Sequence, residues 1–248
     1  MPIRFSRIHK SFGAKRVLVG VDLEIEDGEC FFIVGASGVG KSVLIKHLVG
    51  LLRPDEGEIW LDDQEVSRLP ERDLAPVRKK CALVFQSSTL FDSMTCLDNV
   101  ALPLRKHRRL DLAEARREAR GFLSKVHMET YADALPASLS DGMRKRVAIA
   151  RALTLEPSYV LFDEPTTSLD PVSARRMDRM IRSLSDDHGV TSVVVSHDLT
   201  SMFAIADRIA MLYKGRVHHL GPRGEFRDSP DPVVQQFIQG RAEGPMEV

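Results

Sequence analysis

A glycine-rich segment between two apolar runs is the strongest chemical signal in this sequence. Residues Gly35–Ser42 read GASGVGKS and match the pattern G-x-x-x-x-G-K-[ST]. Glycines let such a loop wrap so that successive backbone N–H groups face one anion, and the helix that follows presents its positive end to the same point. Lys41 adds a positive charge for the β- and γ-phosphates of a nucleotide, and the Ser42 hydroxyl suits Mg²⁺. The segment predicts a nucleoside triphosphate site.

Two adjacent carboxylates follow a second apolar run. The run Val160–Phe162 leads directly into Asp163 and Glu164. In open α/β sheets, ligands collect at the carboxyl ends of strands. There Asp163 can hold Mg²⁺ through water, and Glu164 can polarise an attacking water as a general base. By itself such a pair is more often a helix cap or a solvated turn, but the glycine-rich loop earlier in the chain favours the catalytic interpretation.

Strands and helices that could position these groups alternate along the chain. We expect strands at Val17–Ile25, Cys30–Val34, Glu58–Leu61, Cys81–Phe85, Val160–Phe162, Thr191–Val195 and Ile209–Tyr213, with an irregular strand around Ile3, Phe5 and Ile8. We expect helices at Ser42–Leu52, Asn99–Leu104, Leu112–Val126, Gly142–Leu155, Val172–Leu184, Leu199–Ala206 and Pro232–Ile238. The plan is a helical block inserted into an α/β core. Arg105–Arg120 is dense in Arg and Lys, which is more typical of a solvated helical face than of a partner-binding patch.

The composition is that of a soluble globular protein. The 248 residues carry 35 Lys and Arg against 35 Asp and Glu, and this balance argues against binding nucleic acid through a global positive field. Cys30, Cys81 and Cys96 have no metal-like spacing and indicate free thiols in a reducing compartment. No apolar run reaches the ~20 residues of a spanning helix, and the N-terminus lacks an apolar signal segment. We expect a cytoplasmic protein that reaches a membrane only through a partner.

Further segments make the chain resemble the ATP-binding cassette (ABC) ATPases over nearly its whole length. Leu139–Met143 (LSDGM) stands where that family has its LSGGQ signature. Ser168–Asp170 matches the family's loop between two nucleotide sites, and His197 in Ser196–Asp198 matches its switch histidine. The resemblance implies an α/β P-loop NTPase (RecA-like) core with an antiparallel β subdomain and an inserted α-helical subdomain. The predicted core with its β subdomain spans residues 1–90 and 157–220, the helical signature subdomain residues 91–156, and a C-terminal tail residues 221–248.

The resemblance also implies a role for each matching residue. The expected ATP-binding residues are Phe12, which would stack on adenine, then Gly35, Ala36, Ser37, Gly38, Val39, Gly40, Lys41, Ser42 and Gln86. The expected catalytic residues are Glu164, His197 and Lys41, and the expected Mg²⁺ residues are Ser42, Gln86 and Asp163. Ser140, Asp141 and Gly142 would complete the ATP site of a second subunit, and Asp170 would couple the two sites. The family therefore predicts a homodimer that encloses two ATP molecules, and a monomer that turns ATP over poorly.

The signature departs from the family consensus in two places. Asp141 replaces the first glycine and Met143 replaces the glutamine, whereas Gly142 is kept. A carboxylate near a γ-phosphate is repulsive unless it points into solvent or pairs with a neighbouring cation. The available cations are Arg144, Lys145 and Arg146. We expect Asp141 to be tolerated and to tune turnover.

Less distinctive stretches narrow the resemblance to one branch of the family. Phe85–His107, Leu139–Leu153 and Asp231–Pro245 look like the ATPase subunits of Mla and MCE-type phospholipid transporters. That branch implies integral-membrane permease subunits, an MCE-domain lipid-binding protein and, in some systems, a small STAS-domain subunit. It implies a peripheral position on the cytoplasmic face of the inner membrane, with Phe91–Leu104 against the permease. We expect no nucleic-acid partner, because a net charge of zero fits poorly with strong binding to a phosphate backbone.

Other classes of nucleotide hydrolase share parts of this motif set and have to be weighed against a lipid transporter. An importer of polar amino acids or metals would share the ATPase, although the Met-containing signature and the tail argue against it. A soluble cassette ATPase acting on DNA or ribosomes would usually carry a coiled-coil insertion or a second cassette, and a GTPase would carry N-K-x-D. A catalytically inactive cassette is disfavoured because Lys41, Asp163, Glu164 and His197 are all present.

Overall fold

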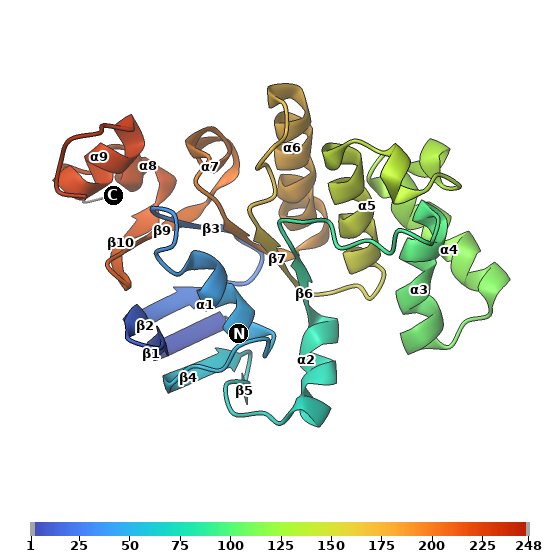
Figure 1. Ribbon diagram of the computed structural model, residues 1–248, viewed down its shortest axis with the longest axis horizontal. Coiled ribbons are helices and arrows are strands. Elements are labelled where there is room, and N and C mark those ends of the chain that lie inside the picture. The colour runs from blue at the N-terminus through green and yellow to red at the C-terminus, as the bar shows by residue number, and fades with distance from the viewer. Residues whose placement is uncertain (1–2, 247–248) are drawn as a thin grey trace.

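Two sheets of different kinds form the part of the molecule that carries the glycine-rich loop (Figure 1). The computed structural model describes residues 3–246; residues 1–2 and 247–248, the outer ends of the predicted core and tail, lie outside the described part. The larger sheet has the order β10-β9-β3-β8-β7-β6. Its strands are β3 (Cys30–Val34), β6 (Cys81–Val84), β7 (Tyr159–Asp163), β8 (Thr191–Val195), β9 (Arg208–Tyr213) and β10 (Arg216–Pro222). β10 is antiparallel to β9, and the other neighbouring pairs are parallel.

The smaller sheet is antiparallel and has the order β2-β1-β4-β5. Its strands are β1 (Ile3–Phe12), β2 (Lys15–Ile25), β4 (Glu56–Leu61) and β5 (Gln64–Glu65). The irregular spacing of Ile3, Phe5 and Ile8 has a local cause. The register of β1 against β2 shifts between Phe5 and Ile8, and Arg7 between them has a φ of 50°. This bulge returns all three apolar side chains to the buried face.

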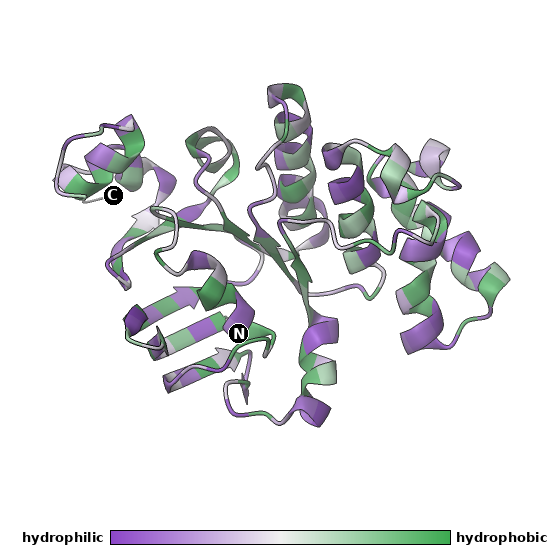
Figure 2. Ribbon diagram, viewed as in Figure 1, coloured by the Kyte–Doolittle hydropathy of each residue, from purple (hydrophilic) through white to green (hydrophobic). Residues whose placement is uncertain are grey.

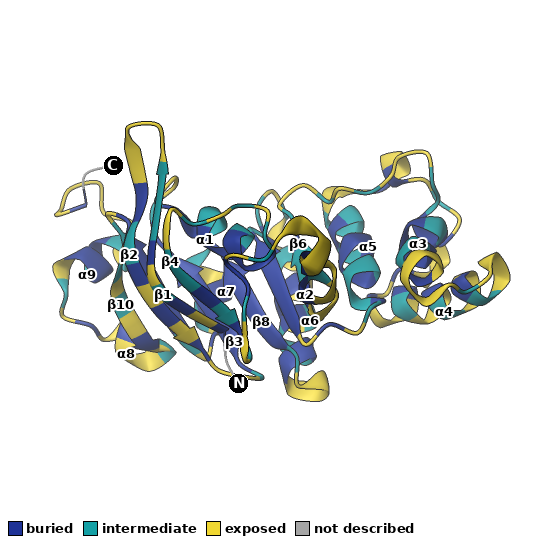
Figure 3. Ribbon diagram, turned by 90° about the horizontal axis from the view of Figure 1, so that it is seen from below, coloured by how far each residue is buried: buried dark blue, intermediate teal, exposed yellow. Residues whose placement is uncertain are grey.

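Helices cover both faces of the larger sheet. α1 (Lys41–Leu48) lies between the two sheets, and α2 (Leu74–Lys80) precedes β6. α6 (Pro171–His188) and α7 (Leu199–Ile205) cover the opposite face. Along β3, Phe32 packs with the α6 and α7 side, whereas Phe31 and Ile33 pack with the α1 side. All residues of β3, β7 and β8 are therefore buried, as their apolar runs predict; they form the hydrophobic centre of Figure 2 and the buried centre of Figure 3.

Three helices form the predicted helical block, at the right of Figure 1. They are α3 (Cys96–Arg108), α4 (Leu112–Lys125) and α5 (Asp141–Leu153). Each begins at a side chain that accepts a hydrogen bond from the first turn, Thr95, Asp111 and Ser140 respectively. Their apolar faces join the same core cluster as Phe32 and α6, so the block packs continuously onto the sheet.

The C-terminal segment is folded against the end of the larger sheet. It contains α8 (Arg223–Arg227) and α9 (Pro232–Gln239). Phe226 and Val234 are buried in the core cluster that includes α7 and β9. The Tyr213 hydroxyl donates a hydrogen bond to the carbonyl of Pro245 at 2.7 Å, which holds the end of the chain beside the sheet.

Some expected boundaries are wrong for local reasons. The helix expected to run to Leu52 ends at Leu48, because Val49 is its C-cap and the next residue, Gly50, takes a left-handed φ of 66°. α2 was not expected because it contains Pro76, which sits in its first turn, where a helix tolerates proline. β10 was also not expected. It follows a tight turn at Lys214 and Gly215 with φ values of 47° and 75°, which is the geometry of a hairpin.

Candidate nucleotide-binding site

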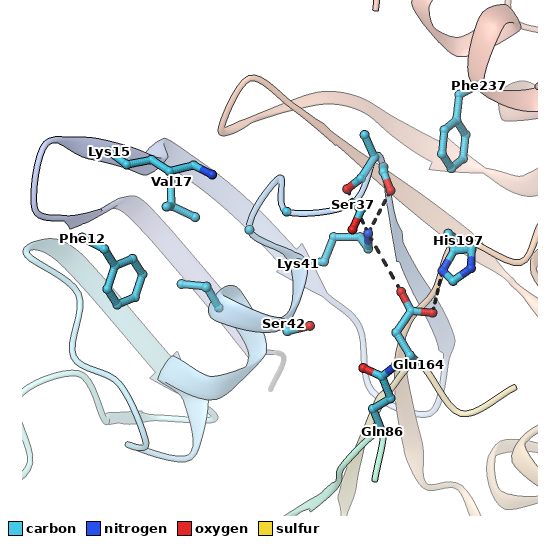
Figure 4. A pocket seen from close by; sticks show the side chains of 15 residues that line it. Phe12, Lys15, Val17, Ser37, Lys41, Ser42, Gln86, Glu164, His197 and Phe237 are labelled. Atoms are coloured by element: carbon cyan, nitrogen blue, oxygen red, sulfur yellow. Dashed lines mark hydrogen bonds and ion pairs between the residues drawn. The ribbon is translucent and has the colours of Figure 1, made fainter. Parts of the chain in front are cut away.

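The glycine-rich loop follows β3 and forms one wall of a cavity of about 620 Å³ (Figure 4). Two of its glycines are required by close approach. Gly35 has a φ of 138°, and a Cβ there would lie 2.3 Å from the carbonyl oxygen of Leu212. Gly40 has a φ of 113°, and its Cβ would lie 2.8 Å from the Leu18 side chain. Larger residues at these positions would displace the backbone N–H groups that make the loop an anion site.

The cavity gathers most of the residues that the sequence predicts for it. These are Phe12, Gly35, Ala36, Ser37, Gly38, Gly40, Lys41, Ser42, Gln86, Glu164 and His197. Val39 and Asp163 are not among them; the Val39 side chain packs against the core beneath the loop, and Asp163 contacts the lining residue Ser42. The remaining lining residues, which sequence reasoning missed, are Lys15, Val17, Val43 and Phe237. No motif marks Phe237, although the helix that carries it was expected.

The Lys41 side chain is buried and hydrogen-bonded to the glycine-rich loop. Its side chain is 7% exposed, and its Nζ donates hydrogen bonds to the carbonyls of Gly35 at 2.8 Å and Ala36 at 3.1 Å. Burial lowers the pKa of Lys41, while the charges of Glu164 and Asp163 raise it. An ammonium in such a place has few water molecules to lose when it meets a phosphate oxygen, so it is suited to bind one.

Ser42, which lines the cavity, contacts Asp163 at the end of β7. The Ser42 hydroxyl donates a hydrogen bond to Asp163 Oδ1 at 2.5 Å, and Lys46 Nζ lies 3.5 Å from Asp163 Oδ2. Helix α1 carries Ser42, and β7 ends at Asp163. A hydroxyl and a carboxylate are oxygen ligands of the kind that Mg²⁺ binds together with substrate phosphates. The donor set therefore fits Mg²⁺ at this point.

Glu164 stands between two cationic or ionisable groups. Its Oε1 lies 4.0 Å from Lys41 Nζ, and its Oε2 lies 2.9 Å from His197 Nδ1 (Figure 4). Oε2 also accepts a hydrogen bond from the Thr167 hydroxyl at 3.1 Å. The Glu164 side chain is 12% exposed, whereas that of His197 is 61% exposed. The carboxylate is thus fixed at the cavity wall, with the geometry of a general base that can receive a proton from water.

Phe12 and Gln86 lie at different sides of the cavity. Phe12, at the end of β1, is 47% exposed, and Lys10 Nζ lies 5.5 Å from its ring centre. This open ring can stack on a base. Gln86 follows β6 and lines both this cavity and a second one of about 410 Å³ that Asp141, Arg144 and Ser168 also line.

The residues of the predicted signature lie apart from the glycine-rich loop. Ser140 caps α5, and its hydroxyl accepts a hydrogen bond from the N–H of Met143 at 3.4 Å. Asp141 forms an ion pair with Arg144. Asp170 caps α6 by accepting hydrogen bonds from the N–H groups of Val172 and Ser173, both at 3.0 Å. Hydrogen bonding from the Ser173 side chain, followed by that from the Ser173 backbone, lowers the pKa of Asp170. None of Ser140, Asp141, Gly142 or Asp170 lines the loop's cavity.

Comparison with known proteins places this site in a family. A family model described as "ABC transporter" matches residues 18–167. The chain is 36% identical over 244 residues to the probable ribonucleotide transport ATP-binding protein mkl of Mycobacterium leprae, covering 98% of this chain and 70% of the relative. It is 39% identical over 238 residues to the methionine import ATP-binding protein MetN of Mesorhizobium japonicum, covering 96% and 65%.

A third relative and a solved structure extend the comparison. The chain is 36% identical over 234 residues to the intermembrane phospholipid transport system ATP-binding protein MlaF of Haemophilus influenzae, covering 94% of this chain and 89% of the relative. It matches a dimeric ATP-binding cassette in a post-hydrolysis state bound to ADP and Pi, with a TM-score of 0.82 and 33% identity. That match covers 89% of this chain and 98% of the other.

A glycine-rich loop after a buried strand, with carboxylates at the end of a nearby strand, defines a P-loop nucleotide hydrolase. This chain belongs to the ABC transporter family, as its resemblance predicts, and it is an ATP-binding subunit that hydrolyses ATP. No helix within residues 3–246 has both the length and the apolar character needed to cross a membrane.

Proposed function

We propose that this chain is the ATP-hydrolysing subunit of a bacterial phospholipid transporter of the Mla/MCE type, positioned on the cytoplasmic face of the inner membrane. The single observation that carries the catalytic part is Glu164, held 2.9 Å from His197 and 4.0 Å from Lys41 beside the glycine-rich loop. The likeness to MlaF over 94% of the chain supports the transporter class.

In the proposed reaction, the loop N–H groups and Lys41 bind the β- and γ-phosphates, and Phe12 stacks on the base. Ser42 and Asp163, with Gln86 nearby, would hold Mg²⁺, which neutralises phosphate charge when bound. Glu164 accepts a proton from a water molecule while the oxygen of that water attacks the γ-phosphorus. The bond between the γ-phosphorus and the β-phosphate oxygen breaks, and ADP is the leaving group. Lys41 and His197 stabilise the charge on the transferring group.

The arrangement of one chain supports a homodimer as the working unit. The cavity at the loop is lined by none of Ser140, Asp141 and Gly142, although the capped end of α5 presents N–H groups suited to an anion. A second copy can bring its α5 to this cavity, and Asp170, which follows both motifs along the chain and caps α6, would couple the two sites. A dimeric cassette with 33% identity supports the same arrangement.

A surface beside α3 supports docking of a permease. A cavity of about 230 Å³ lies there. It is lined by Arg78, Lys79, Ala82, Leu83, Val84, Phe85, Thr89, Pro103, His107, Ala148, Arg151, Ala152 and Leu155. Nearby, Phe91 is 51% exposed, and the Arg151 guanidinium lies 5.9 Å from its ring centre. An exposed ring beside a groove suits the short apolar helix of a membrane partner.

A second candidate is an importer of a polar solute, which the 39% identity to MetN favours. The experiment that separates the two is affinity purification of the tagged full chain from detergent-solubilised membranes. Recovery of a permease with an MCE-domain protein, with or without a small STAS-domain subunit, supports lipid transport. Recovery of a permease with a soluble substrate-binding protein supports import. Recovery with ribosomes or DNA contradicts both.

A further inference from the structure

Lys145 is a buried ammonium that the reaction proposed above does not use. The residue lies on α5 just after the signature and is 5% exposed; within residues 3–246, Lys41 is the other buried lysine. Its Nζ donates hydrogen bonds to the carbonyls of Thr167 at 2.7 Å, Pro165 at 3.0 Å and Glu164 at 3.3 Å. An ammonium has three N–H donors, so each has a carbonyl partner here.

The loop that Lys145 binds is the one that carries the proposed general base. Glu164 has a left-handed φ of 53°, which is uncommon for a residue with a Cβ and has to be held by its surroundings. Thr167, whose carbonyl makes the shortest contact to Lys145, donates its hydroxyl to Glu164 Oε2 at 3.1 Å. Lys145 therefore contacts the backbone of Glu164 directly, and it contacts the Glu164 carboxylate indirectly through Thr167.

The first turn of α5 contacts the same loop on its other side. A Cβ on Gly142 would lie 3.5 Å from Leu169 Cδ2 and 3.5 Å from Ser173 Cβ, so this turn packs directly on the chain beyond Ser168. The end of α5 is thus attached to the loop both before and after Ser168. A shift of α5 would therefore act on the loop that carries Glu164.

We propose that Lys145 is a positioning residue that couples the two nucleotide sites within one chain. The inference rests on the proposed homodimer and on the proposed role of Glu164. The tip of α5 binds the partner's nucleotide, and Lys145 transmits the resulting position of α5 to Glu164 at the chain's own nucleotide. When the dimer closes on one ATP molecule, Glu164 is thereby aligned with the water that attacks the other ATP molecule.

The test compares Lys145→Met and Lys145→Gln with a matched control, Arg146→Met. Arg146 lies on the same helix and also donates to carbonyls, those of Val126 at 3.3 Å and His127 at 3.4 Å, but these are away from the Glu164 loop. Because small misplacements of a catalytic group are costly, Lys145→Met should lower kcat about 10- to 100-fold. KM for ATP should stay within about threefold, because the loop that binds phosphate is untouched. Lys145→Gln keeps amide donors and should recover part of kcat, and Arg146→Met should leave kcat near the parent value.

Folding and binding are followed by thermal melting and by fluorescence of a labelled ATP analogue. If Lys145→Met does not fold, the kcat and the KM for ATP of Lys145→Gln are used instead. A lower kcat in Lys145→Gln with an unchanged KM supports the proposal. Unchanged kcat in the folded Lys145 variants, or an equal loss in Arg146→Met, overturns it. Glu164→Gln is measured in parallel; if that variant turns ATP over at the parent rate, the proposed role of Glu164 has failed instead.

Discussion

Asp141 and Arg144 should have opposite and compensating effects on ATP-driven dimer formation. The two side chains form an ion pair at the first turn of α5, with 53% of the Asp141 side chain and 34% of the Arg144 side chain exposed. Arg144 also donates to the carbonyl of Leu139 at 2.6 Å. An exposed pair of this kind contributes about 0–1 kcal/mol to folding, so variants should fold. The variants should instead change the dissociation constant of the dimer, because in the proposed dimer the first turn of α5 lies beside the phosphates of the partner's ATP.

The magnitude follows from Coulomb's law. A unit charge about 8 Å from a phosphate charge, at an effective dielectric constant of about 40, interacts by about 1 kcal/mol. A symmetric dimer has two such contacts, which gives about 2 kcal/mol or about a 30-fold change in its dissociation constant. Arg144→Gln leaves the carboxylate unpaired and should weaken the dimer by that factor. Asp141→Asn frees the guanidinium and should tighten the dimer by a similar factor, and the double variant should return near the parent.

The assay is light scattering across a range of protein concentrations with ATP and Mg²⁺. The Glu164→Gln background is used so that ATP persists during the measurement. The reasoning is refuted if both single variants form dimers as tightly as the parent, or if the double variant is weaker than Arg144→Gln alone. In the otherwise native chain, Asp141→Gly should change the ATPase rate; an unchanged rate and ATP affinity would show that Asp141 tunes nothing.

Three further substitutions test the nucleotide site. Lys41→Ala should abolish ATP binding in calorimetry, because it removes the cation that meets the phosphates; binding at parent affinity would contradict this. Phe12→Ala should weaken ATP binding about tenfold by loss of base stacking, with kcat retained at saturation, and an unchanged affinity would place adenine elsewhere. Glu164→Gln should lower kcat about 10²- to 10⁴-fold in a phosphate-release assay while ATP still binds; parent turnover would exclude Glu164 as the base.

The sequence predicts the core of this molecule well because its buried strands carry unambiguous patterns. Cys30–Val34 and Thr191–Val195 have the observed bounds, since both faces of each strand are covered and polar residues mark the ends. The irregular spacing in the first strand also has meaning, because a bulge at Arg7 changes the phase of the apolar side chains. Edge elements are harder. β10 is half exposed and polar, so only the Lys214–Gly215 turn could have indicated it.

The site was predictable where a short motif carries the chemistry. The glycine-rich loop and Glu164 line one cavity, and Asp163 contacts Ser42, because both motifs stand at the carboxyl ends of parallel strands of one sheet. Contacts between distant segments were not predictable in this way. Phe237 reaches the cavity from the C-terminal segment. In the sequence, Lys145 is one of several basic residues in a predicted helix and nothing sets it apart. The fold brings its ammonium group to the carbonyls around Glu164.

The central claim is that two chains complete each other's ATP sites, with Ser140 of one copy at the nucleotide of the other. Size-exclusion chromatography with light scattering, applied to Glu164→Gln with and without ATP and Mg²⁺, tests it most directly. We expect twice the mass of one chain with ATP, the mass of one chain without it, and no ATP-driven dimer when Ser140→Arg is added. A Glu164→Gln chain that binds ATP and stays monomeric, or that still dimerises with Ser140→Arg present, would contradict it.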